Sequence, residues 1–175
     1  MVQSNYLLTI GGSRCIVSHS FTALVPPMRP LTDKKISSPD KRVEARLVPT
    51  DGSFWDLSHA ALALRDLSFE ARIFGWNGVW SSCSRYFAIT EWLRVDTAHC
   101  PDMQLVVIDV QNGRECVVEH VSCGFVEPMY FHDDAVKYNK IVKGMDERAV
   151  VKRRIGELAG WRPVPACPSA RGEEG

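Results

Sequence analysis

Two apolar segments, Arg85–Leu93 (RYFAITEWL) and Gln104–Val110 (QLVVIDV), decide the fold of this chain. Both are rich in β-branched and aromatic residues, and both carry apolar residues at odd-numbered as well as at even-numbered positions. Because successive side chains of a β-strand point to opposite faces, this composition is typical of a strand that is covered on both faces. The two segments therefore predict neighbouring strands in the middle of the core. The polar connection between them, Asp96–Asp102, is predicted to protrude.

Turn signals lie on both sides of these segments. Asn112-Gly113 favours positive φ at both positions, which a two-residue type I′ hairpin requires. It predicts that Val106–Val110 pairs with Glu115–Glu119. Gly75-Trp76-Asn77-Gly78 predicts a turn ahead of the central strands, and His132-Asp133-Asp134 predicts another between strands at 125–131 and 136–142.

Upstream, apolar and polar residues alternate from Arg42 to Leu47, which is typical of a half-exposed strand. Residues 58–65 allow a short helix on propensity, but we expect a strand in their second half, followed by an alternating strand that reaches Ile73. Residues 149–158 fit neither period well, so strand and helix both remain open. The predicted organisation is an N-terminal hairpin and proline-rich linker at 1–35, an antiparallel β domain at 36–162 and a flexible tail at 163–175.

An internal repeat is visible at an offset of forty-three positions. Ser38–Ala45 (SPDKRVEA) aligns with Ser81–Ala88 (SSCSRYFA), and Leu64–Leu67 (LRDL) aligns with Val107–Val110 (VIDV). Residues 38–45, 80–90 and 105–116 resemble the blades of β-propeller repeat proteins, in which W-S-P-D-G-R-Y-L-A and I-D-V-x-x-G recur. The resemblance implies a scaffold that usually binds proteins.

About four blades of this length would fit, fewer than most closed propellers use. We therefore expect a mainly β fold, an antiparallel meander of blade-like sheets that forms a partial propeller or a two-sheet sandwich.

Composition excludes several classes of partner. Lys+Arg and Asp+Glu both number 21, so no overall charge draws the chain to nucleic acid or to a membrane surface, and we expect neither as a partner. No apolar run reaches the ~20 residues that span a bilayer, and the first residues lack the pattern of a secretory signal. These observations predict a cytoplasmic protein, whose six cysteines are expected to stay reduced.

Familiar catalytic motifs are absent from the sequence: it has no nucleophile elbow, dinucleotide-binding glycine motif, P-loop or zinc-protease motif. We therefore expect no enzyme, no cofactor and no metal. One alternative is a metal-dependent protein or enzyme that uses Cys and His residues near the Asn112-Gly113 hairpin. Cys116 and His120 have an even spacing, which would place them on one face of a strand. The cluster would be completed by residues among His99, Cys100 and Cys123.

The interpretation we favour is a non-enzymatic module that binds another protein through loops and a sheet face. Aromatic anchors carry much of the energy of such interfaces. The predicted partner-binding residues are Trp76, Asp96, Asp102, His132, Asp133 and Asp134. A bacterial immunity-type protein, which blocks a toxin, fits a small chain without active-site motifs. A structural repeat unit that forms a homo-oligomer through edge strands is a further alternative.

Overall fold

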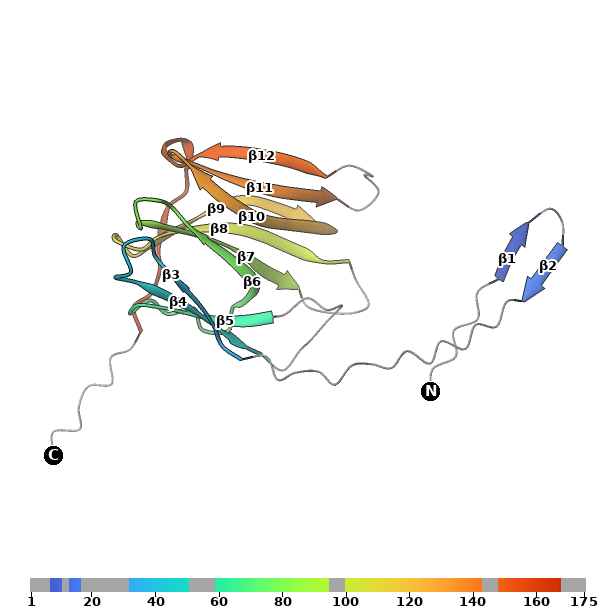
Figure 1. Ribbon diagram of the computed structural model, residues 1–175, viewed down its shortest axis with the longest axis horizontal. Coiled ribbons are helices and arrows are strands. Elements are labelled where there is room, and N and C mark those ends of the chain that lie inside the picture. Colours follow the sequence, from blue (N-terminus) through green and yellow to red (C-terminus); the bar gives the residue numbers. More distant parts are fainter. Residues whose placement is uncertain are drawn as a thin grey trace, which may run out of the picture. The chain divides into compact units, whose positions relative to one another are not determined.

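The computed structural model describes residues 32–50, 59–94, 100–142 and 148–167, together with the backbone of two strands nearer the N-terminus (Figure 1). The chain divides into two compact units, Met1–Pro30 and Leu31–Gly175. In the first unit, β1 (Leu7–Ile10) pairs antiparallel with β2 (Ser13–Ile16). Two strands thus pair where the sequence predicts a hairpin.

In its described residues, the second unit consists of strands and one turn of 3-10 helix. The bounds are β3 (Lys34–Ser37), β4 (Glu44–Pro49), β5 (His59–Leu64), β6 (Ile73–Trp80), β7 (Tyr86–Arg94), β8 (Asp102–Asp109), β9 (Arg114–Ser122), β10 (Gly124–His132), β11 (Ala135–Val142), β12 (Ala149–Arg154), η1 (Ile155–Glu157) and β13 (Arg162–Pro163).

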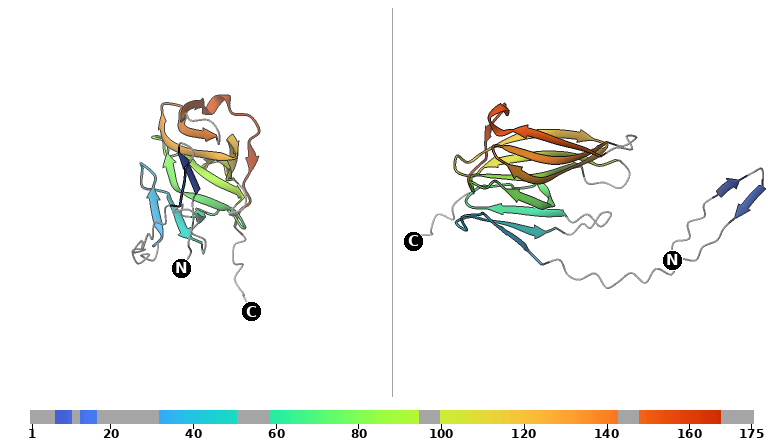
Figure 2. Two further views of the ribbon diagram at one scale, coloured as in Figure 1. Left: turned by 90° about the vertical axis from the view of Figure 1, so that its right-hand side faces the viewer. Right: turned by 45° about the horizontal axis from the view of Figure 1, so that its top comes forward.

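These strands form two antiparallel sheets. One has the order β13-β9-β8-β7-β6-β5-β4-β3, so β3 to β9 follow one another as a meander, and the other has the order β10-β11-β12. The smaller sheet packs on the larger one as a second layer, with β10 over β6 to β9 (Figure 2). The prediction of a mainly β, antiparallel meander is confirmed. The strands that the structure describes do not form a closed propeller.

The segments quoted first form the central strands β7 and β8, and both faces of this pair are buried. Phe87 lies opposite Ile108, and both belong to one core cluster. Ala88 lies opposite Val107, and both belong to a second cluster on the other face. All four side chains are fully buried. The prediction that these strands are covered on two faces is confirmed.

The first cluster is enclosed because the larger sheet curls back on itself. Its members include Leu47 of β4 and Leu62 of β5, which share the cluster with Phe87. Trp80 Nε1 donates to the carbonyl of Ile36 at 2.9 Å. This bond joins the edge strand β3 to β6, although β4 and β5 lie between them in the sheet order.

The second cluster lies between the two sheets. Val126, Val136 and Tyr138 from β10 and β11 share it with Ala88. Thr90 Oγ1 donates to the carbonyl of Val126 at 2.7 Å, so a buried hydroxyl satisfies a backbone acceptor of β10. The smaller sheet is therefore fixed to the larger one by both apolar packing and a hydrogen bond.

Gly124 begins β10 at a point of close backbone approach. A Cβ added there would lie 2.1 Å from the carbonyl oxygen of Ile141 and 2.6 Å from Cγ1 of Val121. Because one of these atoms is backbone, the paired strand itself would have to shift. We expect Gly124→Ala to lower the free energy of unfolding by about 2 kcal/mol, measured by urea denaturation. Gly156→Ala is the control, since a Cβ there meets nothing within 4 Å. An equal stability of both variants would contradict this packing.

The two aligned passages at 38–45 and 81–88 fold into equivalent turns. In each, the N–H of the first serine donates to the carbonyl five residues later, at 2.8 Å in the first turn and 2.9 Å in the second. Lys41 (φ 58°) and Ser84 (φ 60°) hold the position at which the propeller pattern has glycine. The internal repeat is thus present in the backbone of these turns, while membership of the β-propeller proteins stays a prediction.

The predicted turn at Gly75–Gly78 is wrong, because these residues lie within β6. The predicted strand leading to Ile73 is wrong as well, since Glu70 and Ala71 form a turn and β6 begins at Ile73. A Cβ at Gly78 would lie 2.2 Å from Cζ of Phe87. Gly78 is therefore required by the aromatic ring packed on it rather than by a turn.

The predicted pairing across Asn112-Gly113 is confirmed, but the predicted two-residue turn is wrong. Asp109 lies opposite Arg114, so residues 110–113 form a four-residue loop, and within it Gly113 alone has positive φ (59°). The Asp109 carboxylate accepts hydrogen bonds from Asn112 Nδ2 at 2.8 Å and from Arg114 Nε at 3.2 Å. These side-chain bonds stabilise the wider loop.

Both alternatives left open at 149–158 are realised, since β12 is followed by η1. Residues 59–64 form β5 rather than a helix. The fold also continues past the predicted start of the flexible tail: β13 pairs with β9, Val164 is buried, and the Cys167 N–H donates to the carbonyl of Asp66 at 2.6 Å. Residues 163–167 are therefore part of the domain.

Candidate functional site

The side chains predicted to contact a partner do not gather at one place. Trp76 lies on β6, where it is partly buried and packs against the first core cluster, so it is not the exposed anchor that a turn would have presented. Asp102 begins β8, and its Oδ1 lies 2.6 Å from Nε2 of His120. Asp96 lies outside the described residues.

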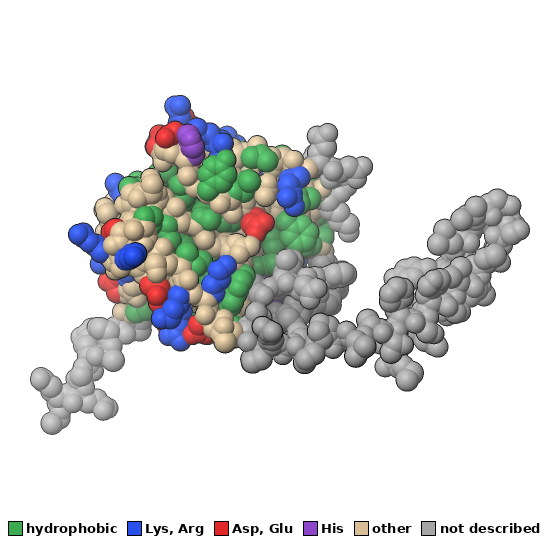
Figure 3. Space-filling model, in the orientation of Figure 1, with side chains coloured by type: hydrophobic (Ala, Val, Ile, Leu, Met, Phe, Trp, Pro, Cys, Tyr) green, Lys and Arg blue, Asp and Glu red, His purple; other side chains and the backbone are tan. Residues whose placement is uncertain are grey.

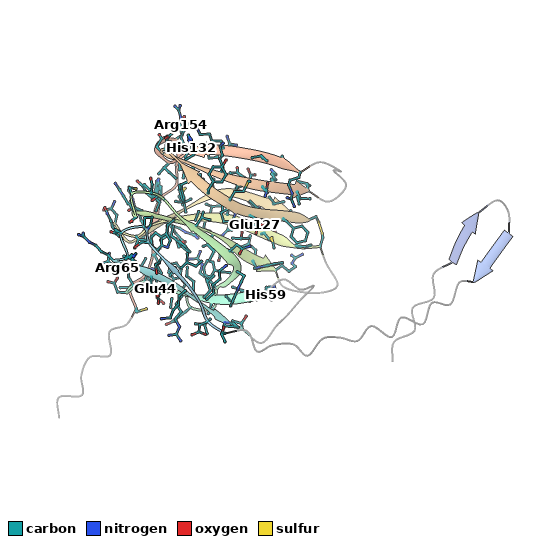
Figure 4. All side chains as sticks on the ribbon, in the orientation of Figure 1. Glu44, His59, Arg65, Glu127, His132 and Arg154 are labelled. Carbon is teal, nitrogen blue, oxygen red and sulfur yellow. A yellow bond between two sulfur atoms is a disulfide. The ribbon has the colours of Figure 1, made fainter. Side chains whose placement is uncertain are left out.

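His132, Asp133 and Asp134 lie at the turn between β10 and β11, as predicted (Figure 4). His132 Nδ1 lies 2.8 Å from Asp133 Oδ2, and both side chains are exposed. The Asp134 carbonyl accepts the N–H of Ile155 at 2.7 Å, which holds the end of β12 to this turn.

Asp102 and this turn lie at opposite ends of β10. The N–H of Gly124, the first residue of β10, donates to the carbonyl of Pro101 at 3.1 Å. His132 is the last residue of the same nine-residue strand. A strand of that length spans about 30 Å, so the two predicted contact regions are separate surfaces.

The alternative Cys/His metal cluster does not assemble. Cys116 lies opposite Val107, whereas His120 lies opposite Gln104, and the register of β8 and β9 shifts between the two pairs. A β-bulge adds one residue to one strand and so changes which face later side chains occupy. Cys116 and His120 therefore point to opposite faces, and the inference from their even spacing is wrong.

The expectation that the cysteines stay reduced is also wrong, since Cys100 and Cys123 form a disulfide with a Cα–Cα distance of 4.7 Å. Cys116 is a buried thiol whose Sγ donates to the carbonyl of Ala159 at 3.0 Å. Within the residues that the structure describes, no three His, Cys, Asp or Glu side chains are grouped to hold a metal ion. His99 lies outside those residues, and the absence of a metal stays a prediction.

A buried charge cluster lies on the face of the first core cluster. The Arg72 guanidinium forms two hydrogen bonds with the Glu91 carboxylate, at 2.7 and 2.8 Å, and one with Glu115 at 2.8 Å. Gln104 Nε2 donates to Glu91 at 2.6 Å, and Arg162 Nε donates to Glu115 at 2.8 Å. Burial raises the pKa of Glu91, but the bonds from Arg72 and Gln104 outweigh it, so this pKa lies below its ordinary value. Because each acid is paired, the cluster is structural.

Two further buried polar groups have no hydrogen-bond partner among the described residues. His59 Nε2 and Trp92 Nε1 are both buried without a hydrogen bond. The two rings meet edge to face, with centroids 4.7 Å apart and planes at 80°. A Cβ at Gly75 would lie 3.9 Å from Trp92 Nε1, so the pair lies against β6.

Among the described residues, exposed large apolar side chains are concentrated on the smaller sheet. We use "outer face" for the side of β10–β12 that points away from the larger sheet. Phe125, Tyr130 and Val150 lie on it, because their chain neighbours Val126, Phe131 and Val151 pack into the second core cluster. Four of the six large apolar side chains exposed in the described residues belong to this sheet, and these four are Phe125, Met129, Tyr130 and Val150. Figure 3 shows apolar side chains gathered over this face.

Cations border these apolar side chains. Lys137 lies opposite Tyr130 on the neighbouring strand and opposite Lys152 on the strand beyond. Lys137 Nζ lies 5.3 Å from the centroid of the Tyr130 ring and 3.2 Å from its hydroxyl oxygen. Arg154 and His132 lie together at one end of the sheet (Figure 4). The outer face thus combines aromatic side chains with cations on β11 and β12 and with the exposed Glu127 on β10.

The support beneath this face is a buried hydrogen-bond network. Burial and the neighbouring Glu119 carboxylate raise the pKa of Tyr138 to about 12. The Tyr138 hydroxyl therefore stays protonated and donates to Glu119 at 2.8 Å, while Lys140 Nζ donates to the other carboxylate oxygen at 2.9 Å. These bonds tie β11 to β9 and hold the outer face on a fixed base.

Sequence reasoning missed this face for a physical reason. Along β10, Phe125 and Met129 alternate with Val126 and Pro128, so both faces of the strand are apolar. The two-residue alternation of side chains along β10 therefore does not show which face is covered. The cations do not resolve the choice either, since Lys137 lies on the uncovered side whereas Lys140 of the same strand lies on the covered side and bonds to Glu119.

Comparison with known proteins gives no relative, because no protein family model, curated protein or solved structure matches the chain. No helix in the described ranges is long and apolar enough to cross a membrane. The cytoplasmic location stays a prediction. Disulfides persist mainly in oxidising compartments, so the bond between Cys100 and Cys123 weighs against the reducing compartment that the sequence predicts.

Proposed function

We propose that the chain is a non-enzymatic module that binds another protein through the outer face of β10–β12. The observation that carries the proposal is the concentration of exposed large apolar side chains on this one small sheet. Soluble proteins rarely expose contiguous apolar surface without a use for it. Tyrosine, phenylalanine and methionine are also the side chains enriched where proteins meet.

The charged groups of the domain support binding rather than catalysis. The buried acids Glu91, Glu115 and Asp109 each pair with an arginine. Although burial raises the pKa values of Glu91 and Asp109, they are lowered overall by these hydrogen bonds, which moves them away from the neutral range in which a general acid or base works best. A bacterial toxin as the partner, the narrower prediction from the sequence, stays a prediction.

Comparative capture tests the proposal. The immobilised wild-type chain and the variant Phe125→Ser/Tyr130→Ser are exposed to lysate of the source cells, and retained proteins are quantified by mass spectrometry. We expect at least one protein to be retained by the wild type and reduced ten-fold or more by the variant, because a few central aromatic anchors carry most of the binding energy.

The matched control is Leu93→Ser/Val117→Ser, which removes two exposed apolar side chains outside β10–β12. It should retain the protein as the wild type does. Thermal midpoints of all three proteins should agree within a few degrees, since exposed positions contribute little to stability. Equal retention by both variants would argue against the outer face as the binding surface.

A further inference from the structure

The smaller sheet has two edge strands, β10, which packs over β6 to β9, and β12. The sheet has the order β10-β11-β12, and no strand that the structure describes pairs with the far side of β12. All six residues of β12 are exposed or partly exposed. Alternate backbone N–H and C=O groups on such an edge are unpaired, which makes the edge a template for an added strand.

The charge on this edge has one sign. Neither β11 nor β12 contains an acidic residue, and Lys152, Arg153 and Arg154 follow one another at the end of β12. Arg154 lies 3.9 Å from Glu157 in an exposed pair, and Lys152 has no acidic partner among the described residues. Exposed ion pairs of this kind are weak, so both outer-face cations are available to a partner.

The positive charge of β12 favours an acidic occupant of this edge. A second copy that added in parallel would bring two clusters of three cations together, and like charges on neighbouring strands repel, whereas an antiparallel copy would place the two clusters at opposite ends of the strand pair. An extended acidic segment would instead place a carboxylate beside each cation. Lys152 and Arg154 share a face about 7 Å apart, which matches acids at alternate positions of an added strand.

We infer that the β12 edge binds an extended acidic segment of the partner protein as an added strand, with its carboxylates beside Lys152 and Arg154. The inference rests on the proposed function, since the segment is part of the protein that docks on the outer face. The inference adds that the backbone of the partner pairs with β12, at the edge of the outer face.

The test uses the full chain and two seven-residue probe peptides. In the first, glutamate alternates with valine, and in the second, lysine replaces glutamate. Amide hydrogen exchange is followed by nuclear magnetic resonance with each peptide at up to millimolar concentration. We expect the glutamate peptide to slow exchange at alternate amides of β12 and the lysine peptide to leave them unchanged.

Charge reversal supplies the second measurement. Lys152→Glu/Arg154→Glu should weaken binding of the glutamate peptide at least ten-fold. Lys41→Glu/Arg42→Glu is the matched control, because it makes the same change in net charge at exposed positions in the turn between β3 and β4. The control should bind as the wild type does, and the wild-type affinity should fall as salt is added.

Three results would overturn the inference: no binding of the glutamate peptide, equal binding of both peptides, or protection away from β12. The proposed function is judged separately by capture with Phe125→Ser/Tyr130→Ser. Loss of capture in that variant together with any of the three results would leave the outer face as the binding surface and remove the β12 edge from it.

Discussion

Replacing Arg72 with Met is expected to lower the free energy of unfolding by about 3–5 kcal/mol at neutral pH. The reason is that Glu91 and Glu115 are buried beside this guanidinium and bond to it directly. Met keeps the packing against Phe69 and Phe74, over which the guanidinium lies at 5.4 and 5.2 Å. The loss therefore reports the uncompensated charge rather than a cavity.

The same variant should show a distinctive pH dependence. In the wild type the pKa of Glu91 is lowered, so the stability from its pairing is present above the unfolded value of 4.5 and is lost as pH falls through the folded pKa. In Arg72→Met, burial without the cation raises this pKa, so protonation relieves the buried charge. The difference in unfolding free energy between wild type and variant should therefore shrink as the pH is lowered toward 4.

Urea denaturation at several pH values measures both effects. Arg42→Met is the control, since Arg42 is exposed and its loss should change stability by less than about 0.5 kcal/mol. A deficit that stays below 1 kcal/mol, or one that is independent of pH, would mean that the carboxylates do not depend on Arg72.

Removing the disulfide is expected to cost about 3 kcal/mol. Cys100 and Cys123 are 23 positions apart, and their bond closes a loop that contains β8 and β9. Without it, the unfolded chain gains conformational freedom, while the folded sheet keeps its backbone pairing. The variant Cys100→Ser/Cys123→Ser should therefore fold but unfold at a lower urea concentration than the oxidised wild type.

The control for the disulfide is Cys83→Ser/Cys167→Ser, which removes two exposed free thiols. It should match the wild type within about 0.5 kcal/mol. Reductant should lower the stability of the wild type and of this control, and should leave Cys100→Ser/Cys123→Ser unchanged. A wild type whose denaturation midpoint is insensitive to reductant would contradict the bond.

The central strands were predictable because their apolar pattern is compatible with only one arrangement, a strand buried on both faces. A segment such as 104–110 that is apolar at both parities must be covered on both faces, and β8 is. The glycines of β6 led to a wrong prediction because glycine has two structural uses. It permits backbone conformations that other residues avoid, and it leaves room for a neighbouring side chain. At Gly78 the neighbour is the Phe87 ring. Which purpose applies depends on a side chain from another strand, so sequence reasoning at that position fails.

The candidate surface was less predictable than the fold. We predicted an interface at the loops because they carry charged and aromatic residues. In the structure, Trp76 packs against the core, and Asp102 and His132 lie near opposite ends of β10. The outer face appears only when the stacking of the sheets shows which side of β10 is left uncovered. The predicted metal cluster failed for a related reason. The register shift between β8 and β9 places Cys116 and His120 on opposite faces, and no sequence pattern predicts that shift.

Site-specific photo-crosslinking tests the binding surface most directly. A photoreactive phenylalanine analogue replaces Tyr130 in one protein and Leu93 in another, and each is irradiated in lysate of the source cells. Both positions are exposed, at 44% and 46%, but only Tyr130 belongs to the outer face. The account predicts a discrete crosslinked protein from position 130 that is absent from position 93 and disappears when Phe125→Ser is added. A discrete product from position 93 with none from position 130 would contradict the assignment of the outer face as the site of protein binding.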